Sequence, residues 1–194
     1  MLIFMTMFTY YVTLYVKDRP VLLFAGLGCM TAVLTFFKLY ADGKFLPLGM
    51  SFYLFQMSAY LIDVYREKIK AEKNIIKYAL FVSFFPQIIS GPIERPYNFL
   101  PQMKKGKKFD YDVVKDGFLL FLWGLLKKIV VADRFAILVN QVFDNISDYN
   151  TPAYLIAMVF FSVQIYFDFA GYSDMAIGVA RMLGINTIKN FDRP

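Results

Sequence analysis

The sequence predicts an all-α membrane protein with several transmembrane helices and one re-entrant segment. Of its 194 residues, 58% are hydrophobic and 19% are aromatic, and the mean hydropathy is +0.49. Soluble domains have roughly 45 to 50% apolar residues and about 25% charged residues. Apolar segments close to the roughly 20 residues that span a bilayer alternate here with short charged stretches. This alternation predicts a chain that crosses the membrane repeatedly.

The first apolar segments lie at residues 1–16, 21–37 and 45–65. Residues 1–16 have no basic residue before them and no small-residue cleavage site, so we expect a membrane segment and not a signal peptide. The second segment continues to Tyr40 and spans the bilayer if the Lys38 ammonium reaches the interface along its apolar stem.

The next apolar segments, residues 75–91, 117–143 and 152–180, are less regular. Pro86 interrupts the first of them, which is also short. Residues 117–143 are broken by charged side chains. These are Lys127, Lys128, Asp133 and Arg134. We expect the two lysines to lie at the membrane interface, with their stems along apolar surface. The alternative is that they form the cationic wall of an acyl-donor site.

Loop charges predict the orientation in the membrane. Residues 66–77 carry five basic and two acidic residues, and residues 92–116 carry six basic and four acidic residues. Lysine and arginine collect in cytoplasmic loops, so we expect both loops in the cytoplasm. The segment 75–91 between them must then enter the membrane and return on the same side. Residues 140–151 contain no lysine or arginine and are expected outside.

The last apolar segment carries polar side chains where hydrocarbon is expected. At 100° per residue, seven of its residues fall within one half of a helix circumference. They are Gln164, Asp168, Gly171, Tyr172, Asp174, Gly178 and Arg181. The Tyr172 phenol can donate to the Asp168 carboxylate four residues away, and the glycines allow a helix or a ligand to approach. Two interpretations stay open: a network that only holds helices together, or the wall of a substrate passage.

Several kinds of chemistry have no support in the sequence. The chain contains no histidine, the commonest general base, and Cys29 is its only cysteine. We find no glycine-rich phosphate loop, nucleophile elbow or pair of catalytic carboxylates, and therefore predict no catalytic, cofactor-binding or metal-binding residue. Asp63 is expected to be either a solvated helix cap or a partner of Arg66. Glu94 with its neighbour Arg95 is expected to be an ordinary loop ion pair.

Four blocks of sequence resemble the membrane-bound O-acyltransferase (MBOAT) family. They are LPLGMSFYLFQMSAYLIDVYR (46–66), FVSFFPQIISGPIERPYNFLPQM (81–103), GLLKKIVVADRF (124–135) and QIYFDFAGYSDMAIGVARMLGINTIKNFDRP (164–194). The similarity is to the branch of the alginate O-acetylation membrane protein and the D-alanyl transfer protein of teichoic acid synthesis. The resemblance covers most of residues 20–194.

The resemblance implies a ring of transmembrane and re-entrant helices around a thin centre crossed by a tunnel. It implies transfer of an acyl group, acetyl by our prediction, from a cytoplasmic acyl thioester such as acyl-CoA to a hydroxyl of an exported or cell-wall polysaccharide. It further implies the bacterial inner membrane, a multi-pass topology, a separate periplasmic or extracellular transferase as partner, and neither a bound cofactor nor nucleic acid. The candidates for lining or supporting the tunnel are Gln164, Asp168, Tyr172, Asp174, Arg181 and Asn190.

The family's catalytic histidine follows soon after the block that ends at Pro194. We therefore expect residues 1–194 to be a single membrane domain, a fragment without the C-terminal catalytic half and inactive by itself. Two alternatives stay open. One is a transporter or channel fragment that uses Asp168 and Asp174, and the other is a truncated membrane protein without catalytic activity.

Overall fold

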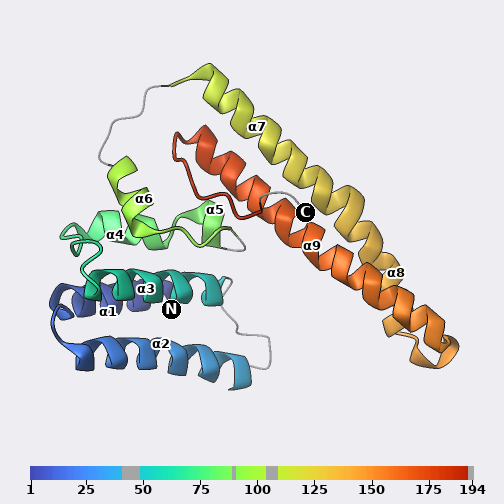
Figure 1. Cartoon of the computed structure of the whole chain (residues 1–194), viewed down its shortest axis with the longest axis horizontal. Helices are drawn as coiled ribbons and strands as arrows, with labels where there is room; N and C mark the ends of the chain where they lie inside the picture. Colours follow the sequence, from blue (N-terminus) through green and yellow to red (C-terminus); the bar gives the residue numbers. More distant parts are fainter. Residues whose placement is uncertain (41–48, 89–90, 104–108, 192–194) are drawn as a thin grey trace. The chain divides into compact units, whose positions relative to one another are not determined.

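The computed structural model describes residues 1–40, 49–88, 91–103 and 109–191, and within these ranges every regular element is a helix (Figure 1). The chain divides into two compact units. The first consists of Met1–Lys108 together with Ile185–Ile188, and the second of Phe109–Gly184 together with Lys189–Pro194. The predicted all-α class is confirmed for the described residues.

The first unit contains three helices side by side and three shorter ones packed against them (Figure 1). The longer helices are α1 (Leu2–Tyr15), α2 (Pro20–Tyr40) and α3 (Met50–Tyr65). The shorter helices are α4 (Ile75–Val82), α5 (Phe85–Ile88) and α6 (Pro96–Gln102). The helices therefore begin and end close to where the apolar segments predict them.

An aromatic chain forms the core of the first unit. The rings of Tyr60 and Tyr78 have centroids 4.8 Å apart, and Phe81 lies 5.6 Å from Phe99. All four side chains are at most 1% exposed. Buried phenols need hydrogen-bond partners, and the Tyr78 hydroxyl donates to Thr9 Oγ1 at 2.8 Å. These contacts join α1, α3, α4 and α6.

The helix breaks at Pro86, as the sequence predicts. Helix α4 ends at Val82 and α5 begins at Phe85, since a proline has no N–H to donate and its ring clashes with the preceding turn. Gly49, which precedes α3, has φ +68°, and a Cβ at this position would collide with the Ile88 carbonyl. A glycine is therefore required where the start of α3 meets the end of α5.

The second unit is a helical hairpin. Its first arm is continuous and consists of α7 (Tyr111–Leu126), the π-helical turn η1 (Lys127–Ala132) and α8 (Asp133–Phe143). After the short 3₁₀ turn η2 (Ile146–Asp148), α9 (Thr151–Met182) returns along the first arm (Figure 1). Asp110 and Asn150 cap the beginnings of α7 and α9 by accepting backbone N–H groups.

Two glycine pairs allow the arms of the hairpin to come very close. A Cβ on Gly124 would lie 2.5 Å from the Gly171 carbonyl oxygen, and a Cβ on Gly178 would lie 2.6 Å from the Gly117 carbonyl oxygen. Small residues at such crossings permit backbone contact, as is common between membrane helices. The prediction that Gly171 and Gly178 admit another helix is thus confirmed, and that helix is α7.

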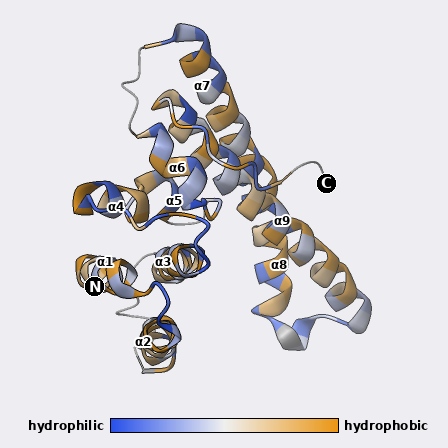
Figure 2. Cartoon of the chain, turned by 60° about the vertical axis from the view of Figure 1, so that its left-hand side comes forward, coloured by the Kyte–Doolittle hydropathy of each residue, from blue (hydrophilic) through white to orange (hydrophobic). Residues whose placement is uncertain are grey.

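Among the residues that the structure describes, two helices have the length and composition to cross a membrane. They are Pro20–Leu39 and Thr151–Met182, with mean hydropathies of 2.0 and 1.6. Large apolar side chains on them are exposed, for example Val21 at 77% and Leu155 at 61%. Figure 2 shows orange, apolar residues along much of α7 and α9, whereas blue collects on connecting segments and at helix ends. Exposed apolar area of this extent is typical of a surface that meets lipid.

Candidate functional site

The two carboxylates within α9 are paired with lysines of the opposite arm. Lys127 Nζ lies 2.7 Å from Asp174 Oδ2, and Lys128 Nζ lies 2.6 Å from Asp168 Oδ1. The lysines belong to η1, halfway along the arm that α7 begins, and Asp168 is close to the middle of α9. The Gly124–Gly171 contact lies beside these pairs and brings the two backbones within side-chain reach.

The π-helical turn adds a second carboxylate to Lys128. Residues five apart in an α-helix point about 140° away from each other at 100° per residue, but a π turn closes between i and i+5 and aligns them. Lys128 Nζ accordingly also lies 2.8 Å from Asp133 Oδ1. Such turns occur frequently at functional sites.

The two lysines have different surroundings. We call Lys127 and Asp174 the closed pair, because their side chains are only 22% and 13% exposed. We call Lys128, Asp133 and Asp168 the open cluster, since the two carboxylates in it are 48% and 41% exposed. In the open cluster one lysine pairs with two carboxylates. The cluster therefore has a net charge of about −1 when all three groups are ionised. The closed pair is neutral.

Aromatic rings lie under both ammonium groups. Lys127 Nζ is 5.9 Å from the centroid of Trp123, and Lys128 Nζ is 5.8 Å from the centroid of Tyr172. A cation over an aromatic face gains roughly 0.5 to 2 kcal/mol, the larger values where water is excluded. The rings thus help to hold lysines at positions where an apolar helix would otherwise disfavour them.

The structure gives Asp168 and Asp174 partners that the sequence interpretation did not assign. Asp168 forms an ion pair with Lys128, whereas a hydrogen bond from the Tyr172 phenol was expected. Lys127 holds Asp174. Their ammonium groups lie against the carboxylates of α9, and the expectation that both lysines extend to the membrane interface stays a prediction.

The remaining tunnel candidates lie around these pairs or beyond α9. Gln164 is on α9 one turn before Asp168, and its Oε1 is buried without a hydrogen-bond partner among the described residues. Asn190 is exposed, in the segment after α9. This segment folds back on α9, because the ring of Phe191 lies 5.5 Å from the ring of Tyr166 and equally far from that of Phe169.

A second polar site, in the first unit, was missed. Glu94 is 0% exposed, and its Oε1 accepts from Asn98 Nδ2 at 2.8 Å and from the Arg95 backbone N–H at 3.1 Å. Its Oε2 accepts from the backbone N–H of Ile188 at 2.7 Å. The expectation of an ordinary loop ion pair with Arg95 is therefore wrong.

Gln102, at the end of α6, also binds the backbone of the segment that contains Ile188. It donates through Nε2 to the Asn186 carbonyl and accepts through Oε1 from the Asn186 N–H, both at 2.8 Å. We call Glu94, Asn98 and Gln102 the 94–102 clamp, since it holds the backbone of residues 186–188. Asn98 and Gln102 are four residues apart on α6 and share one helical face, and Glu94 precedes the N-cap residue Arg95.

Asp63 also differs from its expected role. It is 2% exposed, with Arg95 Nη1 3.4 Å from Oδ2 and Lys68 Nζ 3.9 Å from Oδ1. The expected partner Arg66 forms no ion pair with it in the part of the chain that the structure describes. Asp63 instead helps to fix Arg95, next to the clamp.

The helical architecture, the exposed apolar faces and the charges paired within apolar helices define a helical membrane protein. No family model matches the chain. It is 36% identical over 172 residues to the Pseudomonas putida protein named "Probable alginate O-acetylase AlgI", covering 87% of this chain and 35% of that protein. It is 35% identical over 175 residues to a peptidoglycan O-acetyltransferase of Helicobacter pylori, covering 77% of this chain and 33% of the relative.

A more distant relative is a teichoic acid D-alanyltransferase of Bacillus subtilis, 26% identical over 155 residues, which cover 76% of this chain and 38% of the relative. These proteins are members of one family, and the chain belongs to it: the membrane-bound O-acyltransferases. The chain spans about a third of the length of the curated relatives that it matches. The bacterial relatives and the apolar helices indicate a bacterial membrane protein.

Proposed function

We propose that the whole protein transfers an acyl group, acetyl in our assignment, from a cytoplasmic acyl thioester such as acyl-CoA to a hydroxyl of an exported or cell-wall polysaccharide. The similarity to proteins named as O-acetylases of alginate and peptidoglycan carries this proposal. In the reaction a C–O ester bond forms, the C–S bond breaks, the hydroxyl loses its proton to a base, and the thiol leaves. The chain contains no histidine, so no histidine of these residues acts as that base.

In this proposal the open cluster lines the passage of the acceptor, while the closed pair holds the helices together. The Asp168 side chain is partly exposed, as a residue in the wall of a passage must be. Lys128 is shared between Asp168 and Asp133, so it neutralises the Asp168 charge only in part. A partly solvated carboxylate can accept hydrogen bonds from sugar hydroxyls. Asp174 is nearly enclosed and has a lysine of its own, which suits a structural role.

The membrane arrangement is part of the same proposal. Residues 66–77 and 92–116 face the cytoplasm, the Pro86 segment enters and returns between them, and the helices contribute to a ring of transmembrane and re-entrant segments in the inner membrane. One contact relates the 66–77 loop to a neighbouring turn. Lys17, after α1, lies 3.2 Å from Glu67, after α3, so the α1–α2 turn and the beginning of the 66–77 loop lie on one side. A periplasmic or extracellular transferase completes the proposed pathway of the glycan.

The test uses the full-length protein in a bacterial strain without its own envelope O-acetylation. Ester-bound acetate on the glycan is measured and divided by the amount of folded protein in the membrane. We expect Asp168→Asn and Asp168→Leu to reduce acetylation at least about tenfold, which corresponds to about 1.4 kcal/mol in the barrier, with folded protein near the wild-type amount. Asp148→Asn, which changes an exposed carboxylate at the end of η2, is the matched control and should acetylate normally.

Three outcomes would contradict parts of the proposal. If the wild-type protein adds no acetate, the reaction is wrong, and cation flux through vesicles would then test the transporter alternative. If Asp168→Leu acetylates normally, or loses activity only in proportion to folded protein, the passage role is wrong. If residues 1–194 alone acetylate the glycan above the background without enzyme, the base lies among the residues of this chain.

A further inference from the structure

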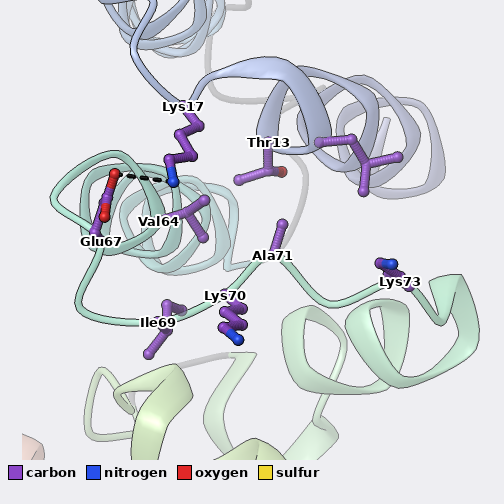
Figure 3. A pocket seen from close by; sticks show the side chains of 9 residues that line it. Thr13, Lys17, Val64, Glu67, Ile69, Lys70, Ala71 and Lys73 are labelled. Carbon is purple, nitrogen blue, oxygen red and sulfur yellow. Dashed lines mark ion pairs between the residues drawn. The ribbon is translucent and has the colours of Figure 1, made fainter.

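A basic cavity lies between the α1–α2 turn and the segment that joins α3 to α4, entirely within the first unit. Its volume is about 370 Å³. Three lysines line it, with one glutamate, one threonine and four apolar side chains. The lining residues are Lys17, Lys70, Lys73, Glu67, Thr13, Leu14, Val64, Ile69 and Ala71. Figure 3 shows Lys17 and Glu67 at one side of the cavity and Lys73 at the other.

The one glutamate in the lining does not neutralise the three lysines of the cavity. Lys17 lies 3.2 Å from Glu67, but in the described part of the chain no carboxylate lies within ion-pair distance of Lys70 or Lys73. The lining therefore has a net charge of about +2. Two lysines of the lining, Lys70 and Lys73, are thus without a carboxylate to neutralise them in the described part of the chain.

The backbone that carries the lysines is fixed in place. The Tyr10 hydroxyl donates to the Lys73 carbonyl at 2.6 Å, and the Glu72 backbone N–H donates to the Tyr60 hydroxyl at 2.7 Å. Asn74 caps α4 directly after this segment. A site whose backbone is already ordered loses less conformational entropy when it binds a ligand.

Two strained residues lie beside the Lys17–Glu67 ion pair. Asp18 has φ +58° and Glu67 has φ +55°, a left-handed conformation that residues other than glycine rarely adopt. Non-glycine residues in this region cost of order 1 kcal/mol or more, and they cluster at binding sites. The two strained residues thus lie in the turns that the Lys17–Glu67 ion pair joins at one side of the cavity.

The position of the cavity indicates which anion fits. In the proposed orientation it lies at the cytoplasmic ends of α1 and α3, at the depth of the lipid headgroups. Tyr11 and Tyr15 on the outside of α1 are 58% and 62% exposed, as is typical of the aromatic belt at a membrane interface. The cavity combines an apolar wall with ammonium groups, which matches a glycerol backbone joined to a phosphate.

We propose that this cavity binds the phosphate-bearing headgroup of an anionic phospholipid of the cytoplasmic leaflet. The Lys70 and Lys73 ammonium groups contact the phosphate, and Val64, Ile69 and Ala71 contact the adjacent glycerol and first acyl carbons. Basic pockets on the cytoplasmic side of membrane proteins bind anionic headgroups in this way. The proposal uses the membrane orientation given above but does not depend on acyl transfer.

The test is a lipid titration of the purified full-length protein in neutral detergent, with the thermal unfolding midpoint as readout. The added lipid is short-chain phosphatidylglycerol, and its comparison is phosphatidylcholine with the same chains. A ligand that binds only the folded state raises the midpoint. We expect phosphatidylglycerol to raise the midpoint of the wild type and phosphatidylcholine to leave it unchanged.

Variants separate the cavity from the general charge of the loop. Lys70→Gln with Lys73→Gln should weaken phosphatidylglycerol binding by about tenfold or more. The matched control, Arg66→Gln with Lys77→Gln, removes the same charge from the same loop outside the cavity and should bind as the wild type does. If the first double variant does not fold, Ala71→Phe tests the cavity, because it fills the space and keeps every charge; it should also abolish the shift.

Two results would overturn the proposal. Equal loss of the midpoint shift in both double variants, or a full shift in Ala71→Phe, would assign the effect to the diffuse positive potential of the loop. A shift with inorganic phosphate as large as with phosphatidylglycerol, at equal concentration, would show a site for a soluble phosphate and not for a lipid. The thermal unfolding midpoint does not depend on acetylation. Failure of the lipid-binding proposal therefore leaves the acyltransfer proposal unaffected.

Discussion

Removing one member of the closed pair should destabilise the hairpin far more than removing both. Lys127→Met leaves Asp174 as an uncompensated carboxylate, and Asp174→Leu leaves an uncompensated ammonium. Both side chains are less than a quarter exposed, so either change exposes the remaining charge to an environment with little water. Breaking a buried pair costs about 3 to 5 kcal/mol, whereas replacing both members by apolar groups of similar volume is often neutral.

We therefore expect each single variant to lose about 3 kcal/mol of unfolding free energy, the lower end of this range, because both groups keep some exposure. The double variant should lie within about 1 kcal/mol of the wild type, which gives a coupling energy of at least about 5 kcal/mol between the two positions. The open cluster supplies the comparison. Lys128 and Asp168 are more exposed, so Asp168→Leu should cost only about 1 kcal/mol.

The assay is unfolding of the 194-residue chain in mixed micelles with increasing sodium dodecyl sulfate. Trp123 is the only tryptophan of the chain, and its ring centroid is 5.9 Å from Lys127 Nζ. Its fluorescence therefore reports on the surroundings of Lys127, whose ammonium group pairs with Asp174 of the other arm. Single variants as stable as the wild type would refute the structural role of the pair. A double variant that loses the sum of the two single losses would refute the coupling.

Three shorter predictions test other parts of the structure. Gly124→Leu should destabilise the hairpin by several kcal/mol, since a Cβ there would lie 2.5 Å from the Gly171 carbonyl oxygen, whereas Gly28→Leu, in open space, should change the unfolding midpoint little. Glu94→Gln places an amide where three N–H groups need acceptors and should speed tryptic cleavage after Lys189 about tenfold or more; an unchanged cleavage rate would contradict the clamp. In cells with Cys29 replaced, an impermeant thiol reagent should label Asp148→Cys and not Lys70→Cys, and labelling of Lys70→Cys would contradict the proposed orientation.

The apolar pattern predicted most of the helices because in this chain the local signals agree. Long apolar runs correspond to α2 and α9, and Pro86 divides the segment 75–91 where its missing N–H requires it. The division into two compact units was not visible in the composition, since the apolar fraction does not change at that boundary. The prediction of a single membrane domain over 1–194, and of a re-entrant segment within it, stays a prediction.

The partners of the buried charges could not be predicted from local spacing. Asp174 and Lys127 are 47 positions apart in the sequence, and a helical wheel of one segment does not show what lies on another. The π-helical turn has no signature in the hydrophobic period, although it decides that Lys128 faces both Asp133 and Asp168. In retrospect, the sequence did contain a signal. Two lysines in one apolar segment and two aspartates in another balance each other's charge, and this balance suggests that they pair.

The same limitation explains why Glu94 was misjudged. Adjacent acidic and basic residues after a glycine and a proline are typical of solvated loops, and only the fold reveals that Ile188 brings its N–H to this carboxylate. The family resemblance covers both segments, but it does not say that they touch. Sequence reasoning therefore found the segments that matter and missed the contact that joins them.

The two lysines differ in the number of carboxylates that they pair with. We therefore expect Asp174 variants to change stability and Asp168 variants to change acetylation, and one set of variants can measure both effects. Lys127 has one carboxylate, which is enclosed, so its partner Asp174 should govern unfolding and affect acetylation only through the amount of folded protein. Lys128 has two carboxylates, both partly exposed, so removing Asp168 still leaves it Asp133 as a counter-ion. For this reason Asp168→Leu is expected to fold, and its loss of acetylation can be attributed to the missing carboxylate and not to a free ammonium. The opposite result, with Asp174 controlling acetylation per folded protein and Asp168 controlling unfolding, would require the two roles to be exchanged.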